Sequence, residues 1–314
     1  MTAKKDSMEN HATTFTPSAQ PRFIPQEQLS LTEQIIKFYE VAGIDYEHWS
    51  KNFNMHFGYY QWNFNPFNRE QMLEQMNDEV AKRLHLSVQK SSFLIDMGCG
   101  VGATARHIAK DYSNSVIKGI TISPWQVEKA AEVNAKAKLQ NQVEVLQGDY
   151  TALPFAENTA DGAFAVESSC HAEGADKIRV ITEMARVLKP GGRFVVADCF
   201  IKRPEKPFNP LMNRCYQAIC RNWVLPEMPT LDYFVEALAA NGMRDIVVED
   251  ISWRIAPSVA HAPFSVCSFI INKLLAGEKL KQQSINNLKG SLLALIMGLN
   301  RSKFSYCLIS GTRS

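Results

Sequence analysis

The stretch FLIDMGCGVGATARHIAK, residues 93–110, decides the fold of this chain. It begins as a short apolar run and ends with helical spacing, and Gly98, Gly100 and Gly102 lie between the two parts. Glycines permit a tight turn and close approach of a ligand, while the first turn of the following helix offers free N–H groups. The spacing GxGxG differs from GxGxxG, and alone it more often marks a plain turn. The surrounding sequence therefore decides between a plain turn and a binding loop.

Short apolar runs alternate with helical stretches after this turn. We expect strands at residues 93–98, 115–122, 142–148, 162–168, 192–200, 244–251 and 304–312, with helices that begin near Gly102, Pro124, Asp176 and Thr230. The alternation predicts an α/β fold: a Rossmann-like, doubly wound, mostly parallel seven-stranded sheet.

The other segments frame this core. Residues 1–28 are polar and aperiodic, which predicts a disordered leader. Residues 29–92 predict a helical cap, with helices at 30–49 and 68–86 around the aromatic-rich stretch 52–67, and Ser30 and Glu33 fit a capping box. The binding core is expected at 93–255, with an insertion at 201–229, and a helical insertion plus the last strand at 256–314. Both insertions follow strands, the fifth and the sixth, so they are candidate lids.

The composition excludes several classes of function. With 34 basic and 32 acidic residues in 314, the formal charge of +2 predicts no nucleic-acid partner. The seven cysteines form no CxxC pair, so we expect no metal site and reduced thiols in a cytoplasmic protein. No apolar run reaches the roughly 18 residues that would predict a transmembrane segment.

Three motifs then occur in a specific order: IDMGCGVG at 95–102, GDYTALPF at 148–155 and RVLKPGGRFVVAD at 186–198. Together they resemble the class I S-adenosylmethionine-dependent methyltransferases over about residues 93–200. The resemblance implies S-adenosylmethionine as the methyl donor. It implies that the methionine part is surrounded by the first motif (Asp96, Gly98, Cys99, Gly100 and Gly102) and that the adenine is bound by Asp149, with Tyr150 beside it.

The second strand departs from many such folds, because Thr121 stands where an acidic residue usually grips the ribose. The stretch GITISPWQ, residues 119–126, is similar to the branch that holds the sterol, tocopherol and cyclopropane-lipid methyltransferases. That likeness implies ribose contact from Gln126, with Thr121 and Ser123 beside it. The missing acid also opposes a nicotinamide-dependent dehydrogenase.

The fourth strand leads into VESSCH, residues 166–171, and Glu167 follows it directly. The segment resembles the corresponding part of sterol and prenyl diphosphate C-methyltransferases, where a glutamate stabilises a carbocation or removes its proton. Methylation of an alkene creates such a cation, which a buried carboxylate and aromatic faces can stabilise. The similar HFGYY segment adds His56 and Tyr59 as candidates, and His171 is a third. Alternatively, Glu167 caps a helix near Ala175, the histidines are loop or packing residues, and the aromatic side chains are core.

The two insertions offer clues to the acceptor. The first carries five basic residues that either lie on a solvated helix or converge on an anionic head such as a diphosphate: Lys202, Arg203, Lys206, Arg214 and Arg221. The second predicts two amphipathic helices, which line a hydrophobic pocket, pack against a second subunit, or do both. A homo-oligomer formed through these helices is the expected assembly.

These features predict a methyltransferase that methylates a carbon of a hydrophobic isoprenoid or lipid-like acceptor, such as a prenyl diphosphate or a sterol-like alkene. Such a reaction belongs to terpene biosynthesis or other secondary metabolism. Two alternatives stay open: an O- or N-methyltransferase of a small natural product, and a non-catalytic donor-binding subunit.

Overall fold

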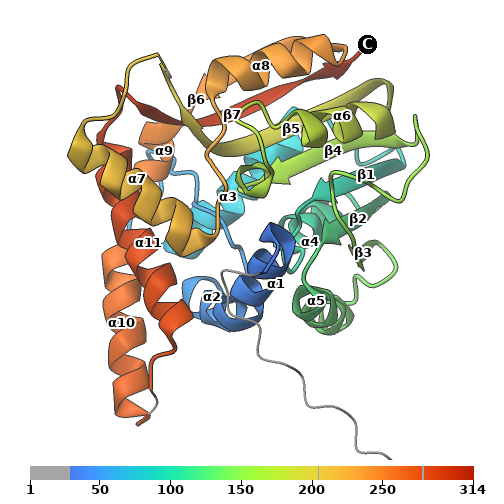
Figure 1. Cartoon of the computed structure of the whole chain (residues 1–314). Coiled ribbons are helices and arrows are strands. Elements are labelled where there is room, and N and C mark those ends of the chain that lie inside the picture. The colour runs from blue at the N-terminus through green and yellow to red at the C-terminus, as the bar shows by residue number, and fades with distance from the viewer. Residues whose placement is uncertain (1–28, 204, 278) are drawn as a thin grey trace, which may run out of the picture.

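The fold is a seven-stranded sheet in the order β3-β2-β1-β4-β5-β7-β6, in which only β7 runs antiparallel to its neighbours. The computed structural model describes residues 29–314 apart from 204 and 278 (Figure 1). The leader predicted at residues 1–28 lies outside the described residues. The predicted α/β fold is confirmed, and all seven strands occur near their expected positions: β1 Ser92–Met97, β2 Ser115–Thr121, β3 Val143–Gln147, β4 Ala160–Val166, β5 Leu188–Ile201, β6 Met243–Asp250 and β7 Phe304–Arg313.

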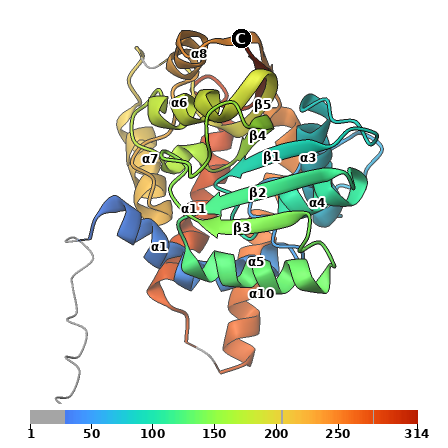
Figure 2. The same ribbon diagram turned by 90° about the vertical axis from the view of Figure 1, so that its right-hand side faces the viewer.

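Helices cover both faces of the sheet. Helices α3 (Arg69–Arg83) and α4 (Ala103–Asp111) share one apolar core with β1, β4, β5 and β7. Helices α6 (Ile178–Val187) and α8 (Leu231–Ala240) form the core of the other face. Helix α5 (Pro124–Lys136) lies alongside β3 at the edge of the sheet (Figure 2).

The cap before β1 consists of α1 (Leu31–Ala42), the short turns η2 (Gly43–Asp45) and α2 (Tyr46–Trp49), and α3. The predicted capping box is present: the Glu33 amide donates to Ser30 Oγ at 3.3 Å, and the Ser30 amide donates to Glu33 Oε2 at 2.7 Å. Helix α1 contacts α5 and α11, so it lies across the carboxyl ends of the strands rather than against the sheet faces. The cap therefore borders the region where open parallel sheets bind ligands.

The insertions form a helical layer beside the sheet. The first contains α7 (Pro210–Trp223), and the second contains α9 (Ser252–Val259), α10 (Ala262–Leu275) and α11 (Gln282–Leu299). The two predicted helices correspond to α10 and α11. Helix α9 was not predicted, because its Pro257 and its eight-residue length weaken the helical pattern, and it runs across the boundary expected at 255. Helix α11 packs against α7, and α10 and α11 extend away from the sheet (Figure 1).

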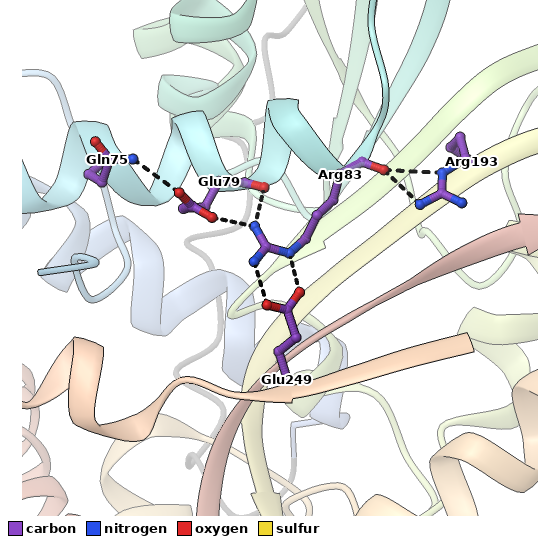
Figure 3. Close-up of polar contacts among 5 residues, drawn as sticks. All are labelled: Gln75, Glu79, Arg83, Arg193 and Glu249. Carbon is purple, nitrogen blue, oxygen red and sulfur yellow. Dashed lines mark hydrogen bonds and ion pairs between the residues drawn. The ribbon is translucent and has the colours of Figure 1, made fainter. Parts of the chain in front are cut away.

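A polar cluster ties the cap to the far edge of the sheet (Figure 3). Arg83 of α3 donates to both carboxylate oxygens of Glu249 in β6, at 2.6 and 2.8 Å, and to Glu79 at 2.5 Å. The Arg83 carbonyl accepts two hydrogen bonds from Arg193 of β5, at 3.1 and 3.0 Å. These contacts fix α3 against the sheet. The aromatic-rich stretch 52–67 precedes α3 and is bound to it through the hydrogen bond from the Tyr59 amide to the Met72 carbonyl.

One stretch of the described residues, Ser252–Leu275, has the length and the mean hydropathy, 1.3, of a membrane-crossing helix. It comprises α9 and α10, and only 33% of its most apolar window is buried. Length and composition alone are weak grounds for a membrane span.

Candidate functional site: two adjoining cavities

Two cavities lie at the carboxyl ends of the strands. The glycine-loop cavity, of about 310 Å³, is lined by the turn after β1 and by the ends of β2 and β3. The aromatic cavity, of about 540 Å³, lies between the cap, the ends of β4 and β5, and the two helical insertions. Five residues line both cavities and form their shared wall: Tyr39, Met55, His56, Glu167 and His171.

The glycine-loop cavity brings together most of the residues expected to bind the donor. They come from three strand ends and their turns: Asp96, Gly98, Cys99, Gly100, Thr121, Gln126, Asp149 and Tyr150. A side chain at Gly98 (φ +83°) would place its Cβ 2.4 Å from Cβ of Ser168, so only glycine keeps this wall open. Gly102 and Ser123 do not line the cavity. Gly102 precedes α4 with φ +79°, and Ser123 Oγ accepts from the Gln126 amide at 3.4 Å, so both shape the turns behind it.

Asp96 carries the strongest sign of a missing ligand. Its side chain is 3% exposed and lines the cavity, yet its Oδ2 has no hydrogen-bond partner. Burial raises the pKa of Asp96 well above its ordinary range, against the opposing effect of Arg106. A buried carboxyl oxygen without a partner is costly, and a cationic group would remove that cost. The ammonium of a methionine moiety is such a group, so the site fits S-adenosylmethionine.

Four other polar side chains of the glycine-loop cavity are held by hydrogen bonds within the protein. Thr121 Oγ1 donates to Gln126 Oε1 at 2.5 Å, which orients the amide that the sequence predicts for ribose contact. Tyr150 Oη donates to the Ser168 carbonyl at 2.9 Å. Asp149 accepts from the Thr151 amide at 2.7 Å, which leaves its other oxygen for a ligand.

Glu167 is the polar centre of the shared wall. It follows β4 with φ +48°, a left-handed conformation that is strained for a residue with a side chain. Its Oε1 accepts from the Phe57 amide at 2.7 Å and from Tyr306 Oη at 2.8 Å. Burial raises the pKa of Glu167 to about 8, which these two hydrogen bonds counteract only in part. The alternative that Glu167 caps the helix near Ala175 is wrong. That helix, α6, begins at Ile178, and the residue at its N-cap is Lys177.

The two candidate histidines lie in the same wall with both ring nitrogens engaged. His171 contacts Tyr39 Oη at 2.9 Å and the Val224 carbonyl at 3.3 Å, and burial lowers its pKa to about 4. His56 contacts the Phe57 carbonyl at 2.9 Å and Asn77 Oδ1 at 3.1 Å, and burial lowers its pKa as well. Both rings are held in place. Burial favours the neutral imidazole at both positions, whereas at His56 the two acceptor oxygens favour the protonated form.

Tyr59 lines neither cavity. Its amide donates to the Met72 carbonyl at 2.7 Å, and its ring packs in the core beside α3 and below Arg254. Phe57 is the only phenylalanine, tyrosine or tryptophan of the aromatic-rich stretch 52–67 that lines the aromatic cavity.

Three residues of the site were missed by the sequence analysis. Tyr306 of β7 holds Glu167, Tyr39 of α1 holds His171, and Asp198 at the end of β5 accepts from Ser169 Oγ at 2.6 Å and from the Cys170 amide at 3.1 Å. Asp198 thereby fixes the loop that follows Glu167. An acidic residue inside an otherwise apolar strand was a usable signal for Asp198, whereas nothing local distinguishes Tyr306 or Tyr39 from other tyrosines.

The aromatic cavity is lined mainly by rings and aliphatic side chains. Nine aromatic residues contribute: Phe38, Tyr39, Tyr46, Trp49, Phe57, Trp223, Trp253, Phe304 and Tyr306. None of the five basic residues of the first insertion lines it, and Lys202 instead pairs with Asp250 at 3.0 Å. Its one lining cation, Arg301, pairs with the same Asp250 at 2.9 Å. The predicted convergence of basic side chains on an anionic head is therefore absent from this cavity.

One group with metal-ligand chemistry occurs among the described residues. Asp78, His107 and Asp111 offer three ligand atoms within 4.8 Å of one another, but they line neither cavity. This group lies between α3 and α4 and takes no part in the site.

The comparisons with known proteins agree with this geometry. Residues 95–196 match the family described as methyltransferase domain. O-methyltransferase resE of Aspergillus sclerotiorum is 30% identical over 241 residues, which cover 72% of this chain and 81% of that protein. Cycloartenol-C-24-methyltransferase 1 of Oryza sativa subsp. japonica is 29% identical over 223 residues, which cover 70% of this chain and 62% of that protein.

A solved structure shares the fold at low identity. Geranyl diphosphate C-methyltransferase from Streptomyces coelicolor A3(2) aligns with a TM-score of 0.69 and 15% identity, over 92% of this chain and all of that one. The chain spans between 39% and 62% of the length of several other curated relatives that it matches. The fitted site, the matched domain and the likeness to resE lead to one assignment. This chain belongs to the S-adenosylmethionine-dependent methyltransferases, and its relatives include sterol C24-methyltransferases and a tocopherol methyltransferase.

Proposed function

We propose that the protein transfers a methyl group from S-adenosylmethionine to a carbon of a hydrophobic isoprenoid or lipid-like acceptor, with Glu167 as the catalytic carboxylate. One observation carries the proposal: Glu167 lies in the wall between a cavity that fits the donor and a larger cavity lined by rings. A carboxylate at that junction is adjacent to both reactants. Catalytic groups in low-dielectric surroundings act strongly on charge that develops beside them.

The donor, when bound, supplies an electrophilic methyl group on a sulfonium. Asp96 would hold the ammonium of the donor, and the glycine turn would surround the rest of its methionine moiety. Gln126 would bind the ribose, and Asp149 would bind the adenine. The positive charge of the donor favours the ionised form of Glu167, whose pKa of about 8 otherwise keeps it protonated at neutral pH. Donor binding thus prepares the carboxylate for the cation that carbon methylation creates.

Glu167 would then act in two successive ways. It would stabilise the positive charge on the acceptor, assisted by the ring faces of residues such as Trp49 and Phe57. It would afterwards accept the proton lost from a neighbouring carbon, with Tyr306 Oη and the Phe57 amide fixing its orientation. His171 would hold the cap closed through Tyr39 rather than exchange protons.

Among hydrophobic acceptors, the lining favours a sterol-like alkene over a prenyl diphosphate. The carboxyl groups of Glu167 and Asp198 line the aromatic cavity, and its cation Arg301 is already paired with Asp250. A diphosphate requires several converging cations. An uncharged alkene requires only apolar and aromatic surface, which this cavity supplies.

Transfer to oxygen or nitrogen of a small natural product is the second candidate, supported by the likeness to O-methyltransferase resE. In that case Glu167, with its raised pKa, would serve as general base toward a hydroxyl or an amine. Both histidines are less suited to this role because their ring nitrogens are engaged.

The test is incubation with methyl-labelled S-adenosylmethionine and separate pools of sterols, prenyl diphosphates, phenols and amines. Products are located by mass spectrometry and NMR. We expect label on a carbon of an uncharged alkene. Label on oxygen or nitrogen would support the second candidate, and donor binding without transfer to any pool would support a non-catalytic subunit. A cytoplasmic location and a homo-oligomer formed through the helical insertions stay predictions, which fractionation and light scattering test.

A further inference from the structure

The second insertion exposes an unusual amount of apolar surface. Of the seventeen large hydrophobic side chains that are exposed in the described part of the chain, eight lie between residues 252 and 299. On α10, Phe264, Ile271 and Leu275 recur at i, i+7 and i+11, so they form one stripe along the helix. Soluble proteins rarely leave such a stripe uncovered without a binding role.

A neighbouring loop adds two large aromatic residues to this surface. The Tyr60 amide donates to the Arg254 carbonyl at 2.8 Å, and His261 Nε2 contacts the Pro66 carbonyl at 2.7 Å, which fixes residues 60–66 against the junction of α9 and α10. In and beside this loop, Trp62 and Phe67 are each 84% exposed. We define the apolar surface as these two residues together with Trp253, Phe264, Ile271, Leu274, Leu275 and Leu299.

The charged residues of 256–300 are mostly positive, and Asp45 of the cap lies close to two of them, Lys273 and Lys281. Residues 256–300 contain four lysines, at 273, 279, 281 and 289, and a single acidic residue at 278. Apolar helices bordered by lysines and exposed tryptophan or phenylalanine are typical of proteins that lie on anionic membranes. Two copies of this surface would bring like charges together, so docking onto a bilayer competes with the homo-oligomer that the sequence predicts through these helices.

The apolar surface is also continuous with the aromatic cavity. Trp253 and Leu299 both line that cavity, yet they are 76% and 84% exposed, so they lie where it opens to the outside. The ring of Trp253 lies below the guanidinium of Arg301, which is 5.5 Å from the ring centre and pairs with Asp250. A hydrophobic molecule that left a lipid layer at this point would enter the cavity without crossing water.

We propose that the apolar surface docks onto an anionic lipid bilayer, lying on it rather than spanning it, and that the acceptor passes from the bilayer into the aromatic cavity beside Trp253 and Leu299. The first part rests on exposure and charge alone. The second part rests on the proposed function, because it requires a hydrophobic acceptor.

The test is co-sedimentation of the full chain with vesicles of phosphatidylcholine alone and of phosphatidylcholine mixed with phosphatidylserine. We expect binding to the anionic vesicles that weakens with added salt and is weaker for the neutral ones. The double variant Leu274→Glu, Leu275→Glu should lower the partition coefficient at least about tenfold. Tyr233→Glu is the matched control, because Tyr233 is 46% exposed on the distant helix α8 and should bind as the unchanged protein does.

Absence of vesicle binding, or equal binding by the double variant, would overturn the proposal. So would a dimer in light scattering that the double variant dissociates, since the surface would then join two copies. Calorimetry with S-adenosylmethionine on the same proteins separates the two proposals, because docking does not require the donor. Vesicle binding without donor binding would sustain the docking surface and reject the methyltransferase mechanism.

Discussion

The two cavities differ in how the chain builds them. The glycine-loop cavity takes the groups that the sequence predicts for donor binding from the ends of three neighbouring strands and their turns, within residues 96–150, and these are backbone, amide and carboxyl groups. The aromatic cavity collects side chains from α1, α2, the stretch before α3, the ends of β4 and β5, α7, α9, α11 and β7. Its recognition groups are rings and aliphatic surface.

This difference separates two kinds of specificity. A cavity with an unpartnered buried carboxyl selects a ligand by charge and hydrogen bonds, and it penalises a ligand that lacks the matching group. A cavity lined by rings selects by shape and apolar area, so it discriminates weakly between acceptors of similar size. Glu167 lies in the wall between the two cavities, so it places a carboxyl group beside a ligand in the aromatic cavity as well.

The strongest test of this division is Glu167→Gln. The amide preserves the shape and still accepts from Phe57 and Tyr306, but it can neither carry the negative charge nor accept the proton. We expect turnover to fall by about 10²–10⁴-fold, with donor affinity changed by less than about fivefold. Steady-state kinetics and calorimetry measure the two effects, and Glu236→Gln on the surface of α8 is the control. Unchanged turnover would remove Glu167 from the mechanism.

Asp96→Asn should affect the glycine-loop cavity alone. Loss of a charge-assisted hydrogen bond to the donor ammonium is expected to weaken donor binding by about 10–100-fold. The same change removes a buried carboxyl whose raised pKa costs the donor-free protein stability at neutral pH, so it should also stabilise that form by about 1 kcal/mol. Calorimetry and urea unfolding report the two effects. Weaker binding together with lower stability would instead indicate a role in folding.

The pH dependence of stability sharpens the assignment of Glu167. Its pKa is higher in the folded chain, about 8, than in the unfolded chain, near 4.5, so the folded state binds the proton more tightly. The associated stability is complete below pH 4.5 and is lost as the pH rises toward 8. Donor-free Glu167→Gln lacks this loss, so it should gain roughly 1–3 kcal/mol over the unchanged protein between pH 5 and pH 8. Urea unfolding measures this difference in stability at each pH. If the difference between the variant and the unchanged protein is the same at pH 5 and at pH 8, the raised pKa is contradicted.

The smallest expected effect lies outside both cavities, in the polar cluster of Figure 3. Glu249→Gln removes the charge from the pair with Arg83, but Glu249 is 40% exposed and Glu79 still compensates the guanidinium. We expect a loss of about 1 kcal/mol in unfolding free energy, with donor affinity unchanged. A drop in donor affinity would show that the position of α3 controls the cavities more directly than the contacts indicate.

The sequence by itself determined the sheet, its strand positions and most of the glycine-loop cavity. These features depend on short-range regularities: apolar runs of strand length, glycines where the backbone turns left-handed, and polar residues directly after strands. Parallel strands then bring their carboxyl ends to one edge, so Asp96, Thr121, Asp149 and Glu167 were predictable as neighbours.

The tertiary structure alone decided which side chains complete the site around Glu167. Tyr306 is 139 residues away from Glu167 along the chain, and Tyr39 is 132 residues away from His171, so only the insertion of β7 beside β5 and the placement of α1 bring them into contact. The same holds for Tyr59. It belongs to the same HFGYY segment as Phe57, but its side chain packs beside α3 and not in a cavity. Such contacts depend on how distant segments pack together, so they cannot be predicted from the local sequence.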